Sequence, residues 1–155
     1  MEKTNVMRIL DQHKIKYNNN YYGDTDAING TDVAKALNED PNKVFKTLIT
    51  VSKTKVYYCF MIPVEKELDL KKCAISVNEK NIEMIPQKEL LSLTGYVHGG
   101  CSPIGLKKQF KVTIDESAEK LEKIIFSAGK IGYQVELEIK DFKKITNCRF
   151  FNICK

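Results

Sequence analysis

Short strand-like segments alternate with short helix-like segments along the chain, and this alternation limits the fold more than any other feature. Residues 133–139 alternate apolar and polar side chains at the two-residue spacing of a β-strand. Residues 46–51 and 56–62 are expected to form two further strands joined by a short hairpin loop. Many strands with short helices between them predict one α+β domain over residues 1–155, built on a mixed and strongly curved sheet.

Turn and capping residues set the limits of the other elements. Thr4 and Thr31 can each cap a short helix, because a threonine hydroxyl accepts a hydrogen bond from a free backbone N–H. Asp40 and Pro41 are expected to start a further helical turn, since proline suits the first helical position. The remaining helices are expected at 69–77, 87–93 and 141–146, and the remaining strands at 82–85, 96–105, 110–115, 121–129 and 149–154, with 96–105 running into a glycine-proline loop.

Residues 17–30 are rich in asparagine, glycine and aspartate, which favour turns and loops. A loop of this length inside a compact domain is uncommon unless it has a functional role. We therefore expect an irregular segment that borders a site.

Composition argues against several classes of protein. The longest apolar runs are far shorter than the ~20 residues needed to cross a membrane. The charged N-terminal segment is unlike a secretory signal, so the sequence indicates a cytoplasmic protein with no membrane partner. The net charge of +5 favours a polyanionic partner, although many proteins without a nucleic-acid role carry a similar charge.

The cysteines and histidines fit neither a disulfide framework nor a metal site. The five cysteines include no Cys-x-x-Cys pair, and the chain has only two histidines. Reduced thiols in a reducing compartment explain this pattern best, and the pattern predicts no metal site.

Three short segments carry residues that suit a functional site. The first places Lys46 among apolar residues, where a helical turn meets a strand. The second contains the adjacent Gly99 and Gly100, whose backbone N–H groups can point at one oxyanion. The third is the small-residue segment 127–130. Each also has an ordinary structural explanation: a lysine stem lying on apolar surface in the first, and a tight turn in the other two.

Together, the segments VFKTL, GYVHGGCSPIG, TIDES and SAGKIGYQVEL occur in the order typical of YbaK-type aminoacyl-tRNA deacylases, and the chain resembles this family over almost its whole length. The same domain is inserted in many bacterial prolyl-tRNA synthetases. The resemblance implies a curved mixed sheet closing toward a barrel, flanked by short helices, with the site in its mouth. It implies a trans-editing hydrolase that cleaves the ester of mischarged aminoacyl-tRNA, with cysteine on the transfer RNA for proline as the usual substrate.

The implied partners are the 3′ end of aminoacyl-tRNA and, in a transient complex, prolyl-tRNA synthetase. The protein is expected to be a monomer that uses no metal and no cofactor.

The resemblance also implies roles for single residues. Lys46 matches the essential lysine of the family, and Gly99 and Gly100 match its glycine pair, so these three are expected to be catalytic. The residues expected to bind substrate are Tyr22, Asn29, Thr47, Ser102, Pro103, Ser127, Gly129 and Gln134.

Three residues depart from the family pattern. Ala128 replaces the middle glycine of an SGG loop, Ile131 stands where arginine is common, and Asn29 stands where an aromatic residue is often found. These positions surround the substrate, so they affect the choice of amino acid more than the type of reaction.

The expected chemistry needs no nucleophile from the protein, because an aminoacyl ester is already reactive. The amides of Gly99 and Gly100 are expected to polarise the scissile carbonyl, and Lys46 to hold the terminal phosphate or ribose. Cys101 and His98 resemble a thiol nucleophile and its base. The family usually has apolar residues at both positions, so we interpret Cys101 as a small core residue.

Two other functions stay open on the sequence. An alanyl-tRNA deacylase is the nearest alternative, and the size of the pocket would separate the two. The other is a non-catalytic module that binds transfer RNA or a synthetase, although such a module need not keep Lys46 and the GGCSP segment. Whether water or the substrate's own thiol attacks the ester is also open.

Overall fold

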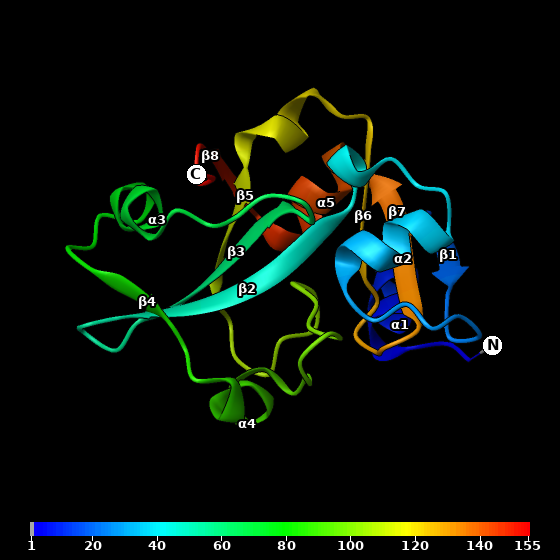
Figure 1. Cartoon of the computed structure of the whole chain (residues 1–155), viewed down its shortest axis with the longest axis horizontal. Coiled ribbons are helices and arrows are strands. Elements are labelled where there is room, and N and C mark those ends of the chain that lie inside the picture. Colours follow the sequence, from blue (N-terminus) through cyan, green and yellow to red (C-terminus); the bar gives the residue numbers. More distant parts are fainter. Residues whose placement is uncertain (1) are drawn as a thin grey trace.

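Two β-sheets form the framework of the chain in the computed structural model, which describes residues 2–155 (Figure 1). The larger sheet has the strand order β4-β2-β3-β5-β8, and the smaller has the order β1-β7-β6. The strands are β1 (Asn18–Tyr21), β2 (Phe45–Ser52), β3 (Tyr57–Pro63), β4 (Ile82–Met84), β5 (Lys111–Asp115), β6 (Lys123–Ser127), β7 (Tyr133–Glu138) and β8 (Arg149–Phe151).

The larger sheet is mixed, as the sequence predicts. β2 and β3 form an antiparallel hairpin in which Lys46 lies opposite Ile62, whereas β3 pairs with β5, and β5 with β8, in parallel. β4 pairs with the far end of β2. The hairpin crosses the molecule from the smaller sheet toward α3 (Leu70–Ser76) (Figure 1).

The smaller sheet is antiparallel throughout, and Gln134 at its centre lies between Asn20 of β1 and Ser127 of β6. The two sheets are joined by a single bridge between Val44 and Ile125. The expectation of one sheet closing toward a barrel is therefore wrong. The reason is local: within residues 2–155 the bridge to β6 is made at Val44, and from the next residue onward β2 pairs with β3 and, at its far end, with β4.

Capping decides where the first helices begin. Thr4 caps α1 (Asn5–Gln12), as predicted, by accepting from the N–H of Met7 (3.3 Å). The predicted cap at Thr31 is wrong, because Asn29 accepts from the N–H of Asp32 (2.9 Å) and starts α2 (Gly30–Ala36) earlier. The other helices are η1 (Pro41–Lys43), which is capped by Asp40 as predicted, and η2 (Gln87–Glu89), α4 (Leu90–Thr94), η3 (Glu116–Lys120) and α5 (Ile139–Thr146).

Two further differences from the expected elements lie near the site. The expected loop 17–30 contains the edge strand β1, whose asparagines pair through their backbone. The expected strand at the start of 96–105 is absent within residues 2–155. The hydroxyl of Tyr96 donates to the carbonyl oxygen of Ile104, so this segment forms a closed loop.

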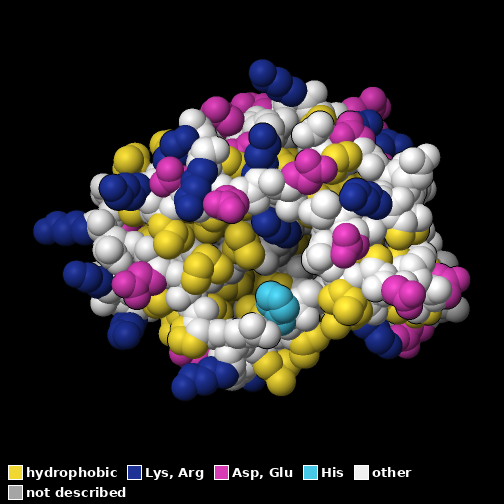
Figure 2. Space-filling view, in the orientation of Figure 1, with side chains coloured by type: hydrophobic (Ala, Val, Ile, Leu, Met, Phe, Trp, Pro, Cys, Tyr) yellow, Lys and Arg dark blue, Asp and Glu magenta, His cyan; other side chains and the backbone are white. Residues whose placement is uncertain are grey.

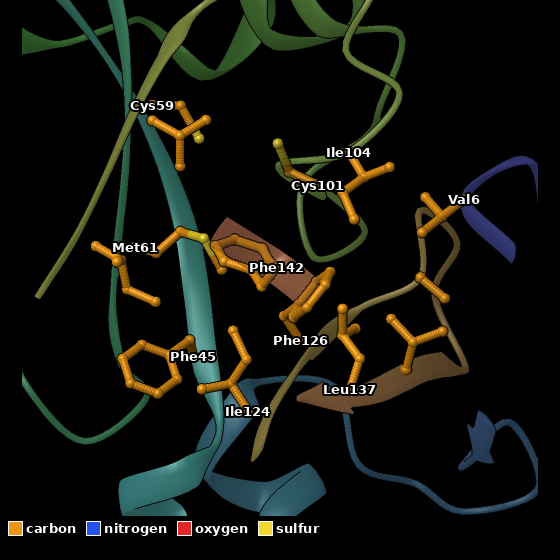
Figure 3. Close-up of a cluster of buried hydrophobic side chains, with 14 of the residues drawn as sticks. Val6, Phe45, Cys59, Met61, Cys101, Ile104, Ile124, Phe126, Leu137 and Phe142 are labelled. Carbon is orange, nitrogen blue, oxygen red and sulfur yellow. The ribbon is translucent and has the colours of Figure 1, made fainter. Parts of the chain in front are cut away.

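One large hydrophobic core lies between the two sheets and so makes the chain a single α+β domain. Phe126 of the smaller sheet packs edge-to-face against Phe142 of α5, with ring centroids 5.2 Å apart. Met61 and Phe45 reach the same core from the larger sheet (Figure 3). Within residues 2–155, no helix has both the length and the apolar character needed to cross a membrane.

Candidate functional site

A cavity of about 270 Å³ lies where the start of β2, the region around α2 and the 98–101 loop meet the smaller sheet. This face of the molecule is hollowed near its centre, with hydrophobic side chains beside a histidine and basic groups (Figure 2). The cavity is lined by seven of the residues predicted to be catalytic or to bind substrate: Tyr22, Asn29, Lys46, Thr47, Gly99, Ser127 and Gln134. Residues far apart in the chain thus converge on one pocket.

Lys46 is half-buried at the start of β2 and lies on the pocket wall. None of the ion pairs among residues 2–155 involves it, so its ammonium group is free to meet an anionic group of a ligand. The next residue, Thr47, has a buried hydroxyl oxygen with no hydrogen-bond partner within residues 2–155. A buried hydroxyl normally has a partner, so Thr47 is also suited to a ligand contact.

The glycine pair divides into two different environments. Gly99 lines the pocket with a φ of +87°, a conformation that favours glycine. Gly100 is absent from the pocket wall, and its N–H donates to the carbonyl oxygen of Val97 (3.0 Å). Among residues 2–155, no backbone hydrogen bond uses the N–H of Gly99 or Cys101, and both residues line the pocket. The amides of Gly99 and Cys101 are therefore candidate donors to a ligand, as is the amide of His98, which also lines the pocket.

Gly100, Ser102 and Pro103 shape the loop from outside the pocket. A Cβ at Gly100 would lie 3.2 Å from the backbone nitrogen of Ile131, so Gly100 allows the two loops to pack closely. Ser102 is fully buried and its Oγ accepts from the N–H of Ile104 (3.4 Å). Pro103 lines a different cavity.

Gly129 also has a packing role. Its φ is +89°, and a Cβ there would lie 2.9 Å from Cε1 of Tyr96 and 3.0 Å from Cγ2 of Val6. The N–H of Gly129 donates to Oγ of Ser127 (3.1 Å), which fixes the hydroxyl on the pocket wall.

The other polar residues of the pocket wall differ in how many of their polar groups already form hydrogen bonds within the protein. Asn29 uses both polar side-chain atoms on Asp32, since its Nδ2 donates to Oδ2 (2.9 Å) and its Oδ1 caps the helix. Tyr22 is 4% exposed, and its backbone N–H donates to the carbonyl oxygen of Gly132 (2.8 Å). Gln134 is 5% exposed and contacts Glu39 behind the wall.

The sequence did not identify most of the apolar residues of the pocket wall as part of a site. These residues are Ile28, Val33, Val44, Phe45, Leu48, Val64 and Leu90. Such residues look like ordinary core positions, and only the sheet arrangement brings them to the pocket. Gly30 also lines the pocket. A Cβ there would lie 2.5 Å from Cγ1 of Val64, so glycine allows the start of α2 to pack against this side chain.

Cys101 and His98 both line the pocket, but the thiol is poorly suited to attack. Burial raises the pKa of Cys101 to about 12, against a smaller opposing effect of a hydrogen bond with Thr94. Roughly one thiol in 10⁵ would then be ionised at pH 7. No cluster of three or more potential metal ligands occurs within residues 2–155.

Comparison with known proteins shows the family to which the chain belongs. Residues 26–145 match the aminoacyl-tRNA editing domain. The chain is 41% identical over 153 residues to EbsC of Enterococcus faecalis, a proposed Cys-tRNA(Pro)/Cys-tRNA(Cys) deacylase. The aligned region covers 98% of this chain and 93% of EbsC.

Two solved structures share the fold at 18% identity. One is a proposed trans-editing enzyme for prolyl-tRNA synthetase, with a TM-score of 0.82 over 97% of this chain and 96% of that one. The other is described only as a hypothetical protein, with a TM-score of 0.88 over 99% of this chain and 100% of that one. The match to the editing domain and the relation to EbsC confirm the resemblance found in the motifs. The chain belongs to the aminoacyl-tRNA editing domain family.

Proposed function

We propose that this chain is a trans-editing hydrolase that cleaves the ester of cysteinyl-tRNA(Pro), with residues 1–155 forming one editing domain. The observation that carries the proposal is the convergence of Lys46, Gly99 and Cys101 on one small pocket. The near full-length relation to EbsC supports the choice of cysteine.

The pocket offers electrostatic help at the point where charge develops. The scissile carbonyl oxygen becomes negative as its carbon is attacked, and the free amides of Gly99 and Cys101 stabilise that charge. Gly100 serves by closing the turn that presents these amides. Lys46 holds the terminal phosphate or ribose of the transfer RNA, because its ammonium group has no anionic partner within residues 2–155.

The polar wall orients the aminoacyl group. Tyr22, Thr47 and Gln134 contact it, with the Thr47 hydroxyl gaining the partner that it lacks. Ser127 and Asn29 complete the wall. Ser102, Pro103 and Gly129 act on the substrate indirectly, by holding the two loops in place.

The substrate supplies the nucleophile. The thiolate of the esterified cysteine attacks its own carbonyl carbon, forming a carbon–sulfur bond and breaking the bond to the ribose oxygen, which takes up a proton. Water then opens the small thiolactone ring. Positioning and oxyanion stabilisation are enough for this route, which explains why the pocket can work without an ionised protein thiol.

A panel of esters on one transfer RNA tests the function. Purified protein is incubated separately with tRNA(Pro) carrying cysteine, alanine, serine or proline, and each rate is corrected for spontaneous hydrolysis. We expect cysteinyl-tRNA to be hydrolysed fastest and prolyl-tRNA to survive. Faster hydrolysis of the alanine ester would show that the protein is an alanyl-tRNA deacylase instead. Binding without hydrolysis of any ester would make it a non-catalytic module.

The partners follow from the same proposal. The 3′ end of aminoacyl-tRNA enters the pocket of a monomer in the cytoplasm, and prolyl-tRNA synthetase presents it in a transient complex. Adding the synthetase should then lower the concentration of editing protein needed for half-maximal hydrolysis. An unchanged concentration dependence would argue for independent capture of the substrate.

A further inference from the structure

Gln134 occupies the boundary between the pocket and a polar cluster behind it. It is 5% exposed at the centre of the smaller sheet and lines the pocket. With its amide oriented so that the nitrogen faces an acceptor, that nitrogen donates to both carboxylate oxygens of Glu39 (2.8 and 3.2 Å). Glu39 does not line the pocket but borders a separate surface cavity.

Glu39 is itself held in place from two sides. Its carboxylate accepts from the Asn20 side chain (3.0 Å), and its backbone N–H donates to the carbonyl oxygen of Ala34 (2.8 Å) just after α2. Partial burial raises the pKa of Glu39, although the hydrogen bond from Asn20 opposes this shift. A half-buried carboxylate with two amide donors accepts hydrogen bonds strongly and has none to donate when ionised.

This arrangement indicates which end of the Gln134 amide donates and which end accepts. An amide group has one donor end and one acceptor end, and Glu39 occupies the donor end. The oxygen then lies at the end of the amide that faces donor groups, so it is the atom that can accept a hydrogen bond. The negative charge behind Gln134 also favours a positively charged ligand group in front of it.

We propose that Glu39 is a positioning residue that fixes Gln134 as an acceptor for the α-ammonium group of the esterified amino acid. This inference rests on the proposed hydrolysis of aminoacyl-tRNA, because an aminoacyl ester carries a free α-ammonium group beside the scissile carbonyl. A hydrogen bond there orients the carbonyl toward the loop amides. Glu39 itself never touches the substrate.

The variant Glu39→Gln tests the idea with little change in shape. Its amide has only one acceptor oxygen for the two donors of Asn20 and Gln134, so the Gln134 amide is no longer held in one orientation. Two esters on the same transfer RNA are compared under single-turnover conditions. One carries cysteine and the other carries 3-mercaptopropanoate, which keeps the thiol but lacks the α-amino group. Each rate is divided by that of spontaneous hydrolysis.

In the unchanged protein we expect cysteine to be preferred at least tenfold over 3-mercaptopropanoate. Glu39→Gln should reduce this preference at least fivefold by slowing only the cysteine ester. Glu136→Gln is the matched control, since Glu136 is a nearby carboxylate that bonds to Asn18 (3.2 Å) instead of Gln134. It should keep the preference. A general loss of structure would slow both esters together and leave their ratio unchanged.

A second variant guards against a folding defect in the first. Gln134→Met keeps a side chain of similar length without the acceptor oxygen, and it should lose the same preference. The inference is overturned if Glu39→Gln, or Gln134→Met in a folded protein, keeps the full preference for cysteine. It is also overturned if the unchanged protein shows no preference while still hydrolysing both esters. Failure of the unchanged protein to hydrolyse either ester would instead refute the proposed function.

Discussion

The backbone N–H of Gly100 donates to the carbonyl oxygen of Val97 at 3.0 Å, and this bond closes the turn that carries Gly99. The two glycines are adjacent and look equivalent in the sequence, but only Gly99 lines the pocket. Gly100 instead lets the turn pack against the backbone at Ile131. The amides of Gly99 and Cys101 have no backbone hydrogen-bond partner within residues 2–155, and they are the donors that we propose for a ligand.

Replacing Gly99 with alanine should slow hydrolysis at least tenfold. The new Cβ has space, 3.8 Å from Ile131, but the φ of +87° disfavours it and the amide must shift. Gly95→Ala is the matched control, because Gly95 has a φ of +82° and lies outside the pocket wall. Thermal melts should show a similar loss of about 1–2 kcal/mol in both variants. Equal single-turnover rates in the two variants would remove the oxyanion role from Gly99.

Lys46→Ala should leave the fold intact and reduce ester hydrolysis at least tenfold, about 1.4 kcal/mol of transition-state stabilisation. The side chain is half-buried on the pocket wall, and no ion pair depends on it within residues 2–155. Lys43→Ala removes the same charge three residues away, at the end of η1, and should keep normal activity. Single-turnover rates and circular dichroism on the same samples give the comparison. Full activity in well-folded Lys46→Ala would place the catalytic charge elsewhere.

Gly129→Ala should act on stability instead of chemistry. A Cβ there meets Tyr96 at 2.9 Å and Val6 at 3.0 Å while the backbone stays at a φ of +89°. Steric crowding and backbone strain together should cost about 2 kcal/mol or more of the free energy of unfolding. Denaturant unfolding measures this loss. The hydrolysis rate per folded molecule should fall less in Gly129→Ala than in Gly99→Ala. A stable but inactive variant would show that Gly129 meets the substrate directly.

Neither the Cys101 thiol nor the His98 ring should be needed for turnover. The pKa of Cys101 is raised to about 12 by burial, so its thiolate is scarce near neutral pH. Cys101→Ala keeps the backbone amide and removes only the thiol. This variant, His98→Ala and the unchanged protein treated with a strong chelator should all hydrolyse the ester at near-normal rates. Loss of activity in folded Cys101→Ala would restore a covalent mechanism.

Local signals in the sequence predicted much of the fold. The Thr4 cap and the Asp40-Pro41 turn are confirmed, because each depends on bonds within a few residues. The strand β1 was missed because its asparagines resemble a loop, and only pairing with β7 makes it a strand. The separation into two sheets also escaped prediction, since it depends on which distant strands pair with one another.

For the pocket as well, residues in local sequence motifs could be predicted, whereas contacts between distant parts of the chain could not. Lys46 and Gly99 stand in motifs, so the sequence alone could single them out, and both line the pocket. The pairing of Gln134 with Glu39 could not, because Glu39 follows α2 and meets β7 only after the chain has folded. Likewise, Val64 lies on the pocket wall only because β3 ends beside Gly30.

The attack by the substrate's own thiol is the central claim, and one comparison of two esters tests it most directly. Cysteine and serine differ by one atom, so the pocket cannot prefer cysteine by excluding a larger serine. A thiolate is far more available and more nucleophilic than an alkoxide near neutral pH. Single-turnover hydrolysis of cysteinyl-tRNA(Pro) and seryl-tRNA(Pro) should therefore differ at least tenfold in favour of cysteine. Equal rates for the two esters, or faster hydrolysis of alanyl-tRNA(Pro), would contradict the thiol mechanism.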